Sequence, residues 1–321
     1  MSENIVKLDV VMIYKDRYPL PIITNDIFME EFENMELRED DIFVITYPKS
    51  GTHWMQEIVN LILVNGHVEK LNSSNRRIVI ELADVTTFTA AALAEAGPVL
   101  RQVKDAPSPR VLSTHVPFPL LPKQLREKRC KVIYVYRHPK DAIVSYYNFS
   151  LKFAHMEYGH PILHTPQQFA HFFDAAVPGK CMFHTSFTVE YGSWFDHVLG
   201  YYQLRHDDNF FAVSYEDMKT NLREVVKRVA SFIGRHLDED ALSRVVEGAS
   251  FQTMKESYKK DHNQNKDKGK GVLDANMFVH KGQTSQWTEY FTAEQNETFD
   301  KLFRDKMVNC EWTVQYEPRH L

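Results

Sequence analysis

Short apolar runs alternate with helical patterns along most of the chain. Residues 42–45 form a continuous apolar run that ends before Pro48 and Gly51, and this predicts a strand buried on both faces. Apolar residues then recur at helical spacing as far as Ile62. Because this succession of strand and helix returns later, we expect an α/β fold, a three-layer sandwich with a mostly parallel central sheet.

The later units begin at further apolar runs. Residues 132–136 and 210–213 each precede apolar residues at helical spacing, and residues 111–115 form a shorter strand-like run. Asp141 is the expected N-cap of the helix that follows residue 136. Near the C-terminus, Thr292 is followed three residues later by Gln295, which predicts a capping box at the start of the last helix.

Composition and charge limit the kinds of function. The 321 residues are 43% apolar, which suits one large core, and we expect residues 1–321 to form a single domain. The 38 basic and 43 acidic side chains give a formal net charge of −5, which argues against a partner such as nucleic acid that binds through overall charge. Any anionic ligand must therefore meet a local cluster of positive charge.

The cysteines and the start of the chain bear on location. Three cysteines without CxxC spacing make neither a disulfide framework nor a zinc site, and they favour a reducing compartment. The first residues lack the basic and apolar parts of a signal peptide, and no apolar run is long enough to cross a membrane. We therefore expect a cytoplasmic protein without a membrane partner.

The loop after the first predicted strand carries anion-binding chemistry. Parallel sheets bind ligands at the carboxyl ends of their strands. Here Lys49, Ser50, Gly51 and Thr52 lead directly into a helix, so backbone N–H groups, an ammonium group and hydroxyls can surround a phosphate-type group. The loop is not the nucleotide-triphosphate motif, because GxxxxGK[ST] is absent. The alternative is an ordinary strand-to-helix turn with a surface lysine.

A second anion site is expected after residue 136. Arg137 follows that strand, and Ser145 comes eight residues later in the next helix. A guanidinium and a hydroxyl placed in this way can bind a second phosphate through charge-assisted hydrogen bonds. A structural ion pair is the alternative for Arg137. The two sites together predict one ligand with two separated phosphate-like groups.

A histidine ends the short run at residues 111–115. We expect His115 on the same strand-end surface as the anion sites, where a neutral imidazole can act as a base. A structural role is the alternative for a lone histidine. The other fourteen histidines show no spacing typical of metal ligands, so we expect no metal site.

Four motifs in consistent order resemble the cytosolic sulfotransferase family. They are YPKSGTHW at residues 47–54, RHPKDAIVSYY at 137–147, YEDM at 215–218, and KG at 281–282 ahead of Trp287. The resemblance extends from about residue 40 to the C-terminus. It implies transfer of the sulfuryl group of 3′-phosphoadenosine 5′-phosphosulfate (PAPS) to a hydroxyl or amine of a small molecule. 3′-Phosphoadenosine 5′-phosphate (PAP) is the product, and no metal is required. The aromatic residues favour a planar phenolic acceptor, with sterols and aliphatic alcohols as the alternatives.

The resemblance also implies residue roles. It makes residues 49–54 a P-loop-like 5′-phosphosulfate loop, with Lys49 stabilising the leaving group, His115 as general base, and Ser145 holding Lys49 until the acceptor binds. The residues that match PAPS-contacting positions are Lys49, Ser50, Gly51, Thr52, His53, Trp54, Arg137, Ser145, Tyr215, Ala249, Ser250, Phe251, Met254, Phe278, Val279, His280, Lys281 and Gly282. Those expected at the acceptor are Ser113, Thr114, His115, Phe149 and Tyr191. Core packing is the alternative role for the last two.

A lysine-rich loop at about residues 255–282 is expected to be a mobile lid over the nucleotide. Its seven lysines and four acidic residues give a local charge of +3. The alternative is a solvated loop without a ligand.

Three departures from the family pattern stand out. Ser113 replaces a lysine found in many members, which removes a positive charge near the transferred group. His280 replaces the usual lid arginine, which should make binding of the 3′-phosphate weaker and more pH-dependent. The family's dimer motif survives only in part, so monomer and homodimer both stay open. The motif positions that remain are Thr288, Thr292, Ala293 and Glu297.

Two other functions are alternatives to sulfuryl transfer. A nucleotide-dependent small-molecule kinase would need the triphosphate loop that is missing. A sulfotransferase-like protein that binds a hydrophobic small molecule with little turnover is compatible with Ser113 and His280. Such a binder would not need Lys49, Arg137 and His115 together.

Overall fold

The fold is built on a four-stranded parallel sheet. The computed structural model describes residues 11–15, 17–21, 26–71, 79–81, 100, 103–127, 130–158, 164–179, 189–257, 259 and 284–312. The sheet order is β4-β3-β5-β6, and each neighbouring pair is parallel. The strands are β3 (Ile42–Thr46), β4 (Val111–Thr114), β5 (Lys131–Tyr136) and β6 (Phe210–Ser214). The predicted α/β class is confirmed.

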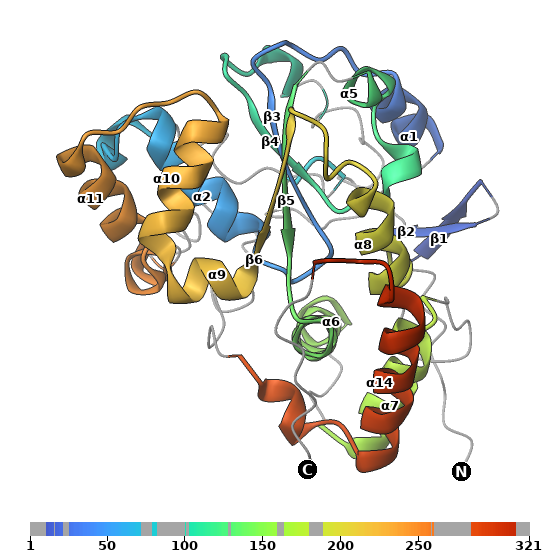
Figure 1. The fold of residues 1–321 in the computed structure, drawn as a ribbon. Helices are drawn as coiled ribbons and strands as arrows, with labels where there is room; N and C mark the ends of the chain where they lie inside the picture. The colour runs from blue at the N-terminus through green and yellow to red at the C-terminus, as the bar shows by residue number, and fades with distance from the viewer. Residues whose placement is uncertain are drawn as a thin grey trace.

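Helices cover both faces of the sheet (Figure 1), because successive side chains on a strand point to opposite faces. In β3, Ile42 and Val44 enter one core, while Phe43 and Ile45 enter the other. The first core is closed by α2 (Thr52–Leu63), α9 (Tyr215–Thr220), α10 (Leu222–Phe232) and α11 (Glu239–Gly248). The second is closed by α1 (Asp26–Glu33), α6 (Pro139–Tyr158), α7 (Pro166–Ala176), α8 (Trp194–Tyr202) and α14 (Ala293–Met307).

Shorter elements complete the described part of the chain. An antiparallel hairpin consists of β1 (Val11–Tyr14) and β2 (Tyr18–Pro21). The remaining short elements are α5 (Lys123–Arg126) and the 3₁₀ helices η1 (Val68–Lys70), η2 (Phe118–Leu120) and η3 (Gln286–Glu289). Among the helices of the described ranges, none has both the length and the apolar character to cross a membrane.

Local rules predicted one helix start correctly and failed at another. The capping box is confirmed: Thr292 Oγ1 accepts from Gln295 N at 3.2 Å, and Gln295 Oε1 accepts from Thr292 N at 3.0 Å. The N-cap expected at Asp141 is wrong. Helix α6 already begins at Pro139, because proline lacks an N–H and suits the first helical position.

Asp141 instead attaches a later part of the chain. Its carboxylate accepts from the N–H groups of Ser285 at 2.7 Å and Trp287 at 3.2 Å. The neighbouring Lys140 is buried, pairs with Asp300 on α14, and lies 4.2 Å from the centroid of the Trp287 ring. The start of α6 is thereby tied to η3 and α14.

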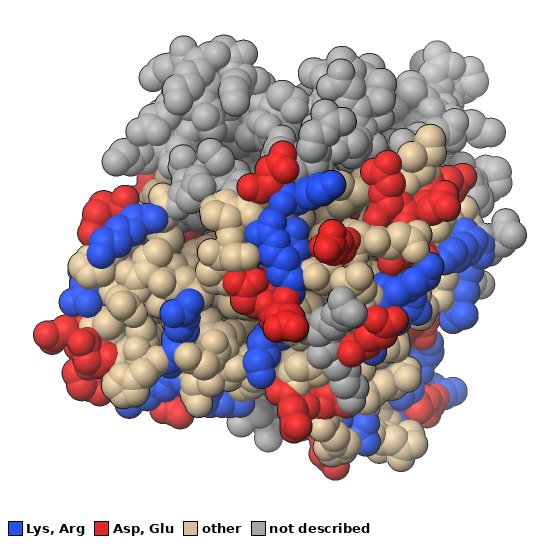
Figure 2. Space-filling model, turned by 90° about the horizontal axis from the view of Figure 1, so that it is seen from above, with Lys and Arg blue, Asp and Glu red and all other residues tan. Residues whose placement is uncertain are grey.

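Charges of both signs are mixed on the face seen from above Figure 1. Figure 2 shows Lys and Arg side chains interspersed with Asp and Glu, with no large patch of one sign on the atoms coloured there. The atoms coloured on this face therefore offer no concentrated positive charge for an anionic ligand. Of the expected lid, the structure describes only residues 255–257 and 259, so the lid and the single-domain boundary stay predictions.

Candidate active site

The loop between β3 and α2 has the backbone of an anion cradle. Gly51 precedes the first residue of α2 and has φ 107°, and Lys49 also has a positive φ of 65°. A Cβ on Gly51 would lie 2.9 Å from Cδ2 of Tyr215, so only glycine fits without a shift. Ser50 is fully buried, and its Oγ has no hydrogen-bond partner among the described residues. A buried hydroxyl of this kind fits a ligand oxygen.

Arg137 joins this loop to the end of β5. Its Nη1 donates to the main-chain oxygen of Lys49 at 2.9 Å, and its guanidinium carbon lies 4.5 Å from the centroid of the Tyr215 ring. Trp54 meets the same ring edge-on at 5.5 Å and donates from Nε1 to Ala249 O at 2.8 Å. The structure thus brings together five of the residues expected at PAPS.

Lys49 contacts both Arg137, through its main-chain oxygen, and Phe149, one of the expected acceptor residues, through its side chain. Its Nζ lies 4.5 Å from the centroid of the Phe149 ring, a favourable cation–π distance. Burial, together with the positive charges of Arg137 and Lys152, lowers the pKa of Lys49 to about 7. Around neutral pH the ammonium group is therefore only partly populated until an anion approaches.

His115 presents a defined tautomer directly after β4. Its Nδ1 lies 2.9 Å from the main-chain oxygen of Thr46, and since a carbonyl can only accept, Nδ1 carries the proton. Burial lowers the pKa of His115 to about 4; the Thr46 carbonyl opposes this shift and the Lys49 charge adds to it. The ring is therefore neutral, and Nε2 holds the lone pair that a general base needs.

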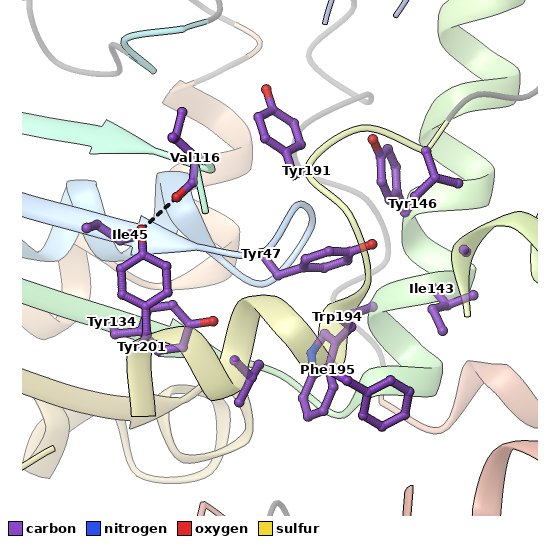
Figure 3. Packing of buried hydrophobic residues seen from close by; sticks show 14 of the residues in the cluster. Ile45, Tyr47, Val116, Tyr134, Ile143, Tyr146, Tyr191, Trp194, Phe195 and Tyr201 are labelled. Atoms are coloured by element: carbon purple, nitrogen blue, oxygen red, sulfur yellow. Dashed lines mark hydrogen bonds between the residues drawn. The ribbon is translucent and has the colours of Figure 1, made fainter. Parts of the chain in front are cut away.

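Tyr191 lies against His115. The two rings meet edge-on with centroids 5.5 Å apart. Tyr191 has φ 68° and its N–H donates to Pro19 O on β2 at 2.6 Å, so the hairpin holds this unusual backbone in place. Figure 3 shows Tyr191 and Tyr146 on separate segments, both above Tyr47 in this view.

Two carboxyl groups next to this cluster, the buried Glu81 and the half-buried Glu190, were not predicted from the sequence. Glu81 accepts from the N–H of His115 at 2.5 Å, and Glu190 accepts from the hydroxyl of Tyr146. Burial raises the pKa of each to about 7. Glu81 could have been noticed as a charge that ends the apolar run at residues 78–80; Glu190 gives no such signal.

Other predicted residues lie apart or outside the described ranges. Ser113 faces α2, where its hydroxyl accepts from Gln56 Nε2 at 2.7 Å, and Thr114 Oγ1 accepts from Val116 N at 3.0 Å. Ser145 is half-buried on α6. Ser50 lies in the cradle loop, and Thr52 and His53 open α2. Ser250, Phe251 and Met254 follow α11, and Phe251 is exposed. The matches at 278–282, Phe278 to Gly282, lie outside the described residues.

A parallel α/β sheet with an anion cradle at its strand ends and a neutral histidine beside it defines a group-transfer type of site. Residues 39–311 match the family model of the sulfotransferase domain. The chain belongs to the sulfotransferase family, and it is an enzyme of that class.

Named relatives support this assignment over most of the chain. Sulfotransferase 1B1 of Mus musculus is 35% identical, covering 95% of this chain and 94% of its own length. Amine sulfotransferase of Oryctolagus cuniculus is 32% identical over 87% of this chain and 84% of its own length. Among solved structures, mouse sulfotransferase SULT7A1 complexed with PAP superposes with a TM-score of 0.70 at 28% identity, covering 94% of this chain and 96% of that one.

Proposed function

We propose that this protein transfers the sulfuryl group of PAPS to a hydroxyl or amine of a small molecule, with a phenol as the leading acceptor and His115 as the general base. The observation that carries the proposal is the tautomer of His115. Its Nδ1 proton is committed to Thr46 O at 2.9 Å, so Nε2 is ready to accept a proton.

The residues at the strand ends fit a donor with two separated anionic groups. The partnerless Ser50 hydroxyl and the N-terminus of α2, which directly follows Gly51, suit one group. Arg137, above the Tyr215 ring, suits the second. The PAP complex of mouse SULT7A1, at 28% identity, supports PAPS as the donor.

In the proposed reaction, the acceptor oxygen attacks the sulfur of PAPS and forms the new S–O bond while its proton moves to His115 Nε2. The bond between sulfur and the oxygen that bridges it to the 5′-phosphate breaks, and this oxygen leaves as part of PAP. General-base catalysis of this kind contributes about 10²–10⁴ in rate. The rings of Tyr191 and Phe149 supply flat apolar surfaces suited to an aromatic acceptor.

Lys49 is proposed to stabilise the charge that forms on the leaving oxygen. Lys49 belongs to the loop with the positive-φ backbone, where a preorganised positive charge would stabilise the oxygen that leaves. The position of its Nζ, 4.5 Å from the centroid of the Phe149 ring, supports a place next to the proposed acceptor pocket. A role for Ser145 in holding Lys49 stays a prediction, as does the lid at 255–282.

The test is transfer from radiolabelled PAPS to a panel of phenols, arylalkylamines, alcohols and steroids. We expect labelled product with at least one phenol, and a loss of about 10²–10⁴ in kcat for His115→Ala. PAP binding by His115→Ala, measured by calorimetry, serves as the folding control. A variant with full turnover would contradict the base assignment. Tight PAP binding without transfer to any acceptor would favour a binding protein.

A further inference from the structure

The main chain of His115 lies just beyond the hydrogen-bonded part of β4. Strand β4 ends at Thr114, and at its outer edge the described chain adds only an isolated bridge between Val79 and Ser113. His115 is nevertheless buried, at 8% exposure. Its N–H and C=O groups therefore need partners that are not strand neighbours, because buried main-chain groups without partners are costly.

Glu81 meets the N–H group. The segment before it is held by the bridge and by a hydrogen bond from Ile80 N to Ser113 O at 2.9 Å. This places the Glu81 carboxylate 2.5 Å from His115 N, in a position that is 1% exposed. A carboxyl oxygen accepts from a backbone N–H in either protonation state, and the carboxylate form, which predominates above pH about 7 here, accepts more strongly.

His197 meets the C=O group. Its Nε2 lies 2.9 Å from His115 O, and its Nδ1 lies 2.8 Å from the hydroxyl of Tyr134. Since the carbonyl can only accept, Nε2 carries the proton and the Tyr134 hydroxyl donates to Nδ1. Burial lowers the pKa of His197 to about 3, so the ring keeps this neutral tautomer. The bond from the Tyr134 hydroxyl to Nδ1 therefore holds the His197 ring with its Nε2–H directed at His115 O.

Helix α8 makes a second bond of the same kind one turn later. Tyr201 donates from its hydroxyl to Val116 O at 2.6 Å, the dashed line in Figure 3. Residues four apart lie on one face of a helix, so His197 and Tyr201 hold two successive carbonyls after β4. Tyr201 is itself stacked on Tyr134 with centroids 4.6 Å apart.

We propose that Glu81 and His197 are positioning residues for the reaction: they hold the main chain of His115 from both sides so that its Nε2 faces the acceptor. With Nδ1 bound to Thr46 O, every polar atom of His115 except Nε2 has a protein partner among the described residues. A small misplacement of a reacting group is costly in rate. The inference rests on the proposed role of His115.

The first experiment compares His197→Ala and His197→Gln in PAPS turnover with a phenol. Glutamine retains an N–H donor near the position of Nε2, so it should recover most of the rate. We expect His197→Ala to lower kcat about 10- to 100-fold, which is the cost of a poorly held reacting group, with little change in KM for PAPS. His236→Ala, at an exposed histidine, is the matched control. Equal losses in the alanine and glutamine variants would overturn the proposal.

A double-mutant cycle separates positioning from general stability. If His197 acts through His115, then His197→Ala should cause no further loss in a His115→Ala protein. The same holds for Glu81→Ala, while Glu81→Gln keeps an acceptor for the His115 N–H and should retain most activity. Equal fold-losses in both backgrounds would contradict positioning. Full activity of His115→Ala alone would instead refute the base assignment itself.

The pH profile gives an independent readout. The charged and titratable groups that face His115 are Lys49, Glu81, Tyr191 and His197. In His197→Ala, water can reach the His115 backbone and ring, so the acid limb of kcat/KM should move from below pH 5 toward the ordinary histidine value of about 6.5. An unchanged acid limb, together with PAP binding equal to wild type, would count against the inference.

Discussion

The guanidinium of Arg137 donates from Nη1 to the main-chain oxygen of Lys49 at 2.9 Å. This bond joins two strand-end loops that are 88 residues apart in sequence. It ties the two loops together at the Lys49 backbone, which has φ 65°. A single side chain therefore joins the two loops that are proposed to bind the anionic groups of the donor.

Replacement of Arg137 by lysine should weaken PAP binding about 10- to 100-fold, because a point charge replaces a planar fork that makes charge-assisted bonds of roughly 1.5–3 kcal/mol. Isothermal titration calorimetry with PAP measures this. Arg223→Lys is the matched control, since Arg223 pairs with Glu239 on the surface of α10 and α11. Equal PAP affinity in the two variants would contradict the assignment of Arg137.

The kcat/KM for PAPS should fall as pH rises through about 7, because Lys49 of the free enzyme loses its proton there. Burial lowers the pKa of Lys49 to about 7, so its ammonium form is present below this value and lost above it. The kcat/KM for PAPS reports the free enzyme. In Lys49→Arg the alkaline limb should move upward, since arginine stays charged. A limb at the same pH in both proteins would assign it to another group.

Gly51→Ala should weaken PAP binding and lower thermal stability. The new Cβ would lie 2.9 Å from Tyr215 Cδ2, on a backbone with φ 107°. Gly234→Ala is a matched control, because its φ is 71° and nothing lies within 4 Å of the added Cβ. Both variants should show backbone strain of about 1–2 kcal/mol, but only Gly51→Ala should lose PAP affinity. Calorimetry with PAP and thermal unfolding distinguish the two.

The unfolding free energy should depend less on pH in Glu190→Gln than in wild type. Burial raises the pKa of Glu190 from 4.5 to about 7, with partial opposition from the Tyr146 hydrogen bond. Between these values the folded protein binds more protons at this site than the unfolded chain, so wild-type stability falls as pH rises through this window. Glutamine removes the titration and still accepts from Tyr146.

Urea unfolding at pH 5 and pH 8 checks the prediction for Glu190, with exposed Glu247→Gln as control. The stability of Glu190→Gln relative to wild type should improve on going from pH 5 to pH 8. If this difference is the same at both pH values, Glu190 does not titrate as its burial indicates.

Much of the fold could be predicted because its causes are local. The apolar runs became strands, since fully buried parallel strands leave no polar alternation in the sequence. The capping box at Thr292 and Gln295 formed for the same reason, as both bonds lie within one turn. Asp141 failed as a cap because its carboxylate serves Ser285 and Trp287, which are far away in the chain.

The sequence by itself determined the parallel α/β class, the strand-to-helix loop at residues 49–52 and the strand-end positions of Arg137 and His115. These follow from periodicity and from the rule that ligands bind at carboxyl ends. Only the tertiary structure decided how His115 is held. Glu81 and His197 lie 34 and 82 residues from it in sequence. Such contacts depend on how distant segments pack. Hydrogen-bond partners set the tautomer of His197, and burial shifts the pKa of Glu81 and of His197, so no local pattern records them.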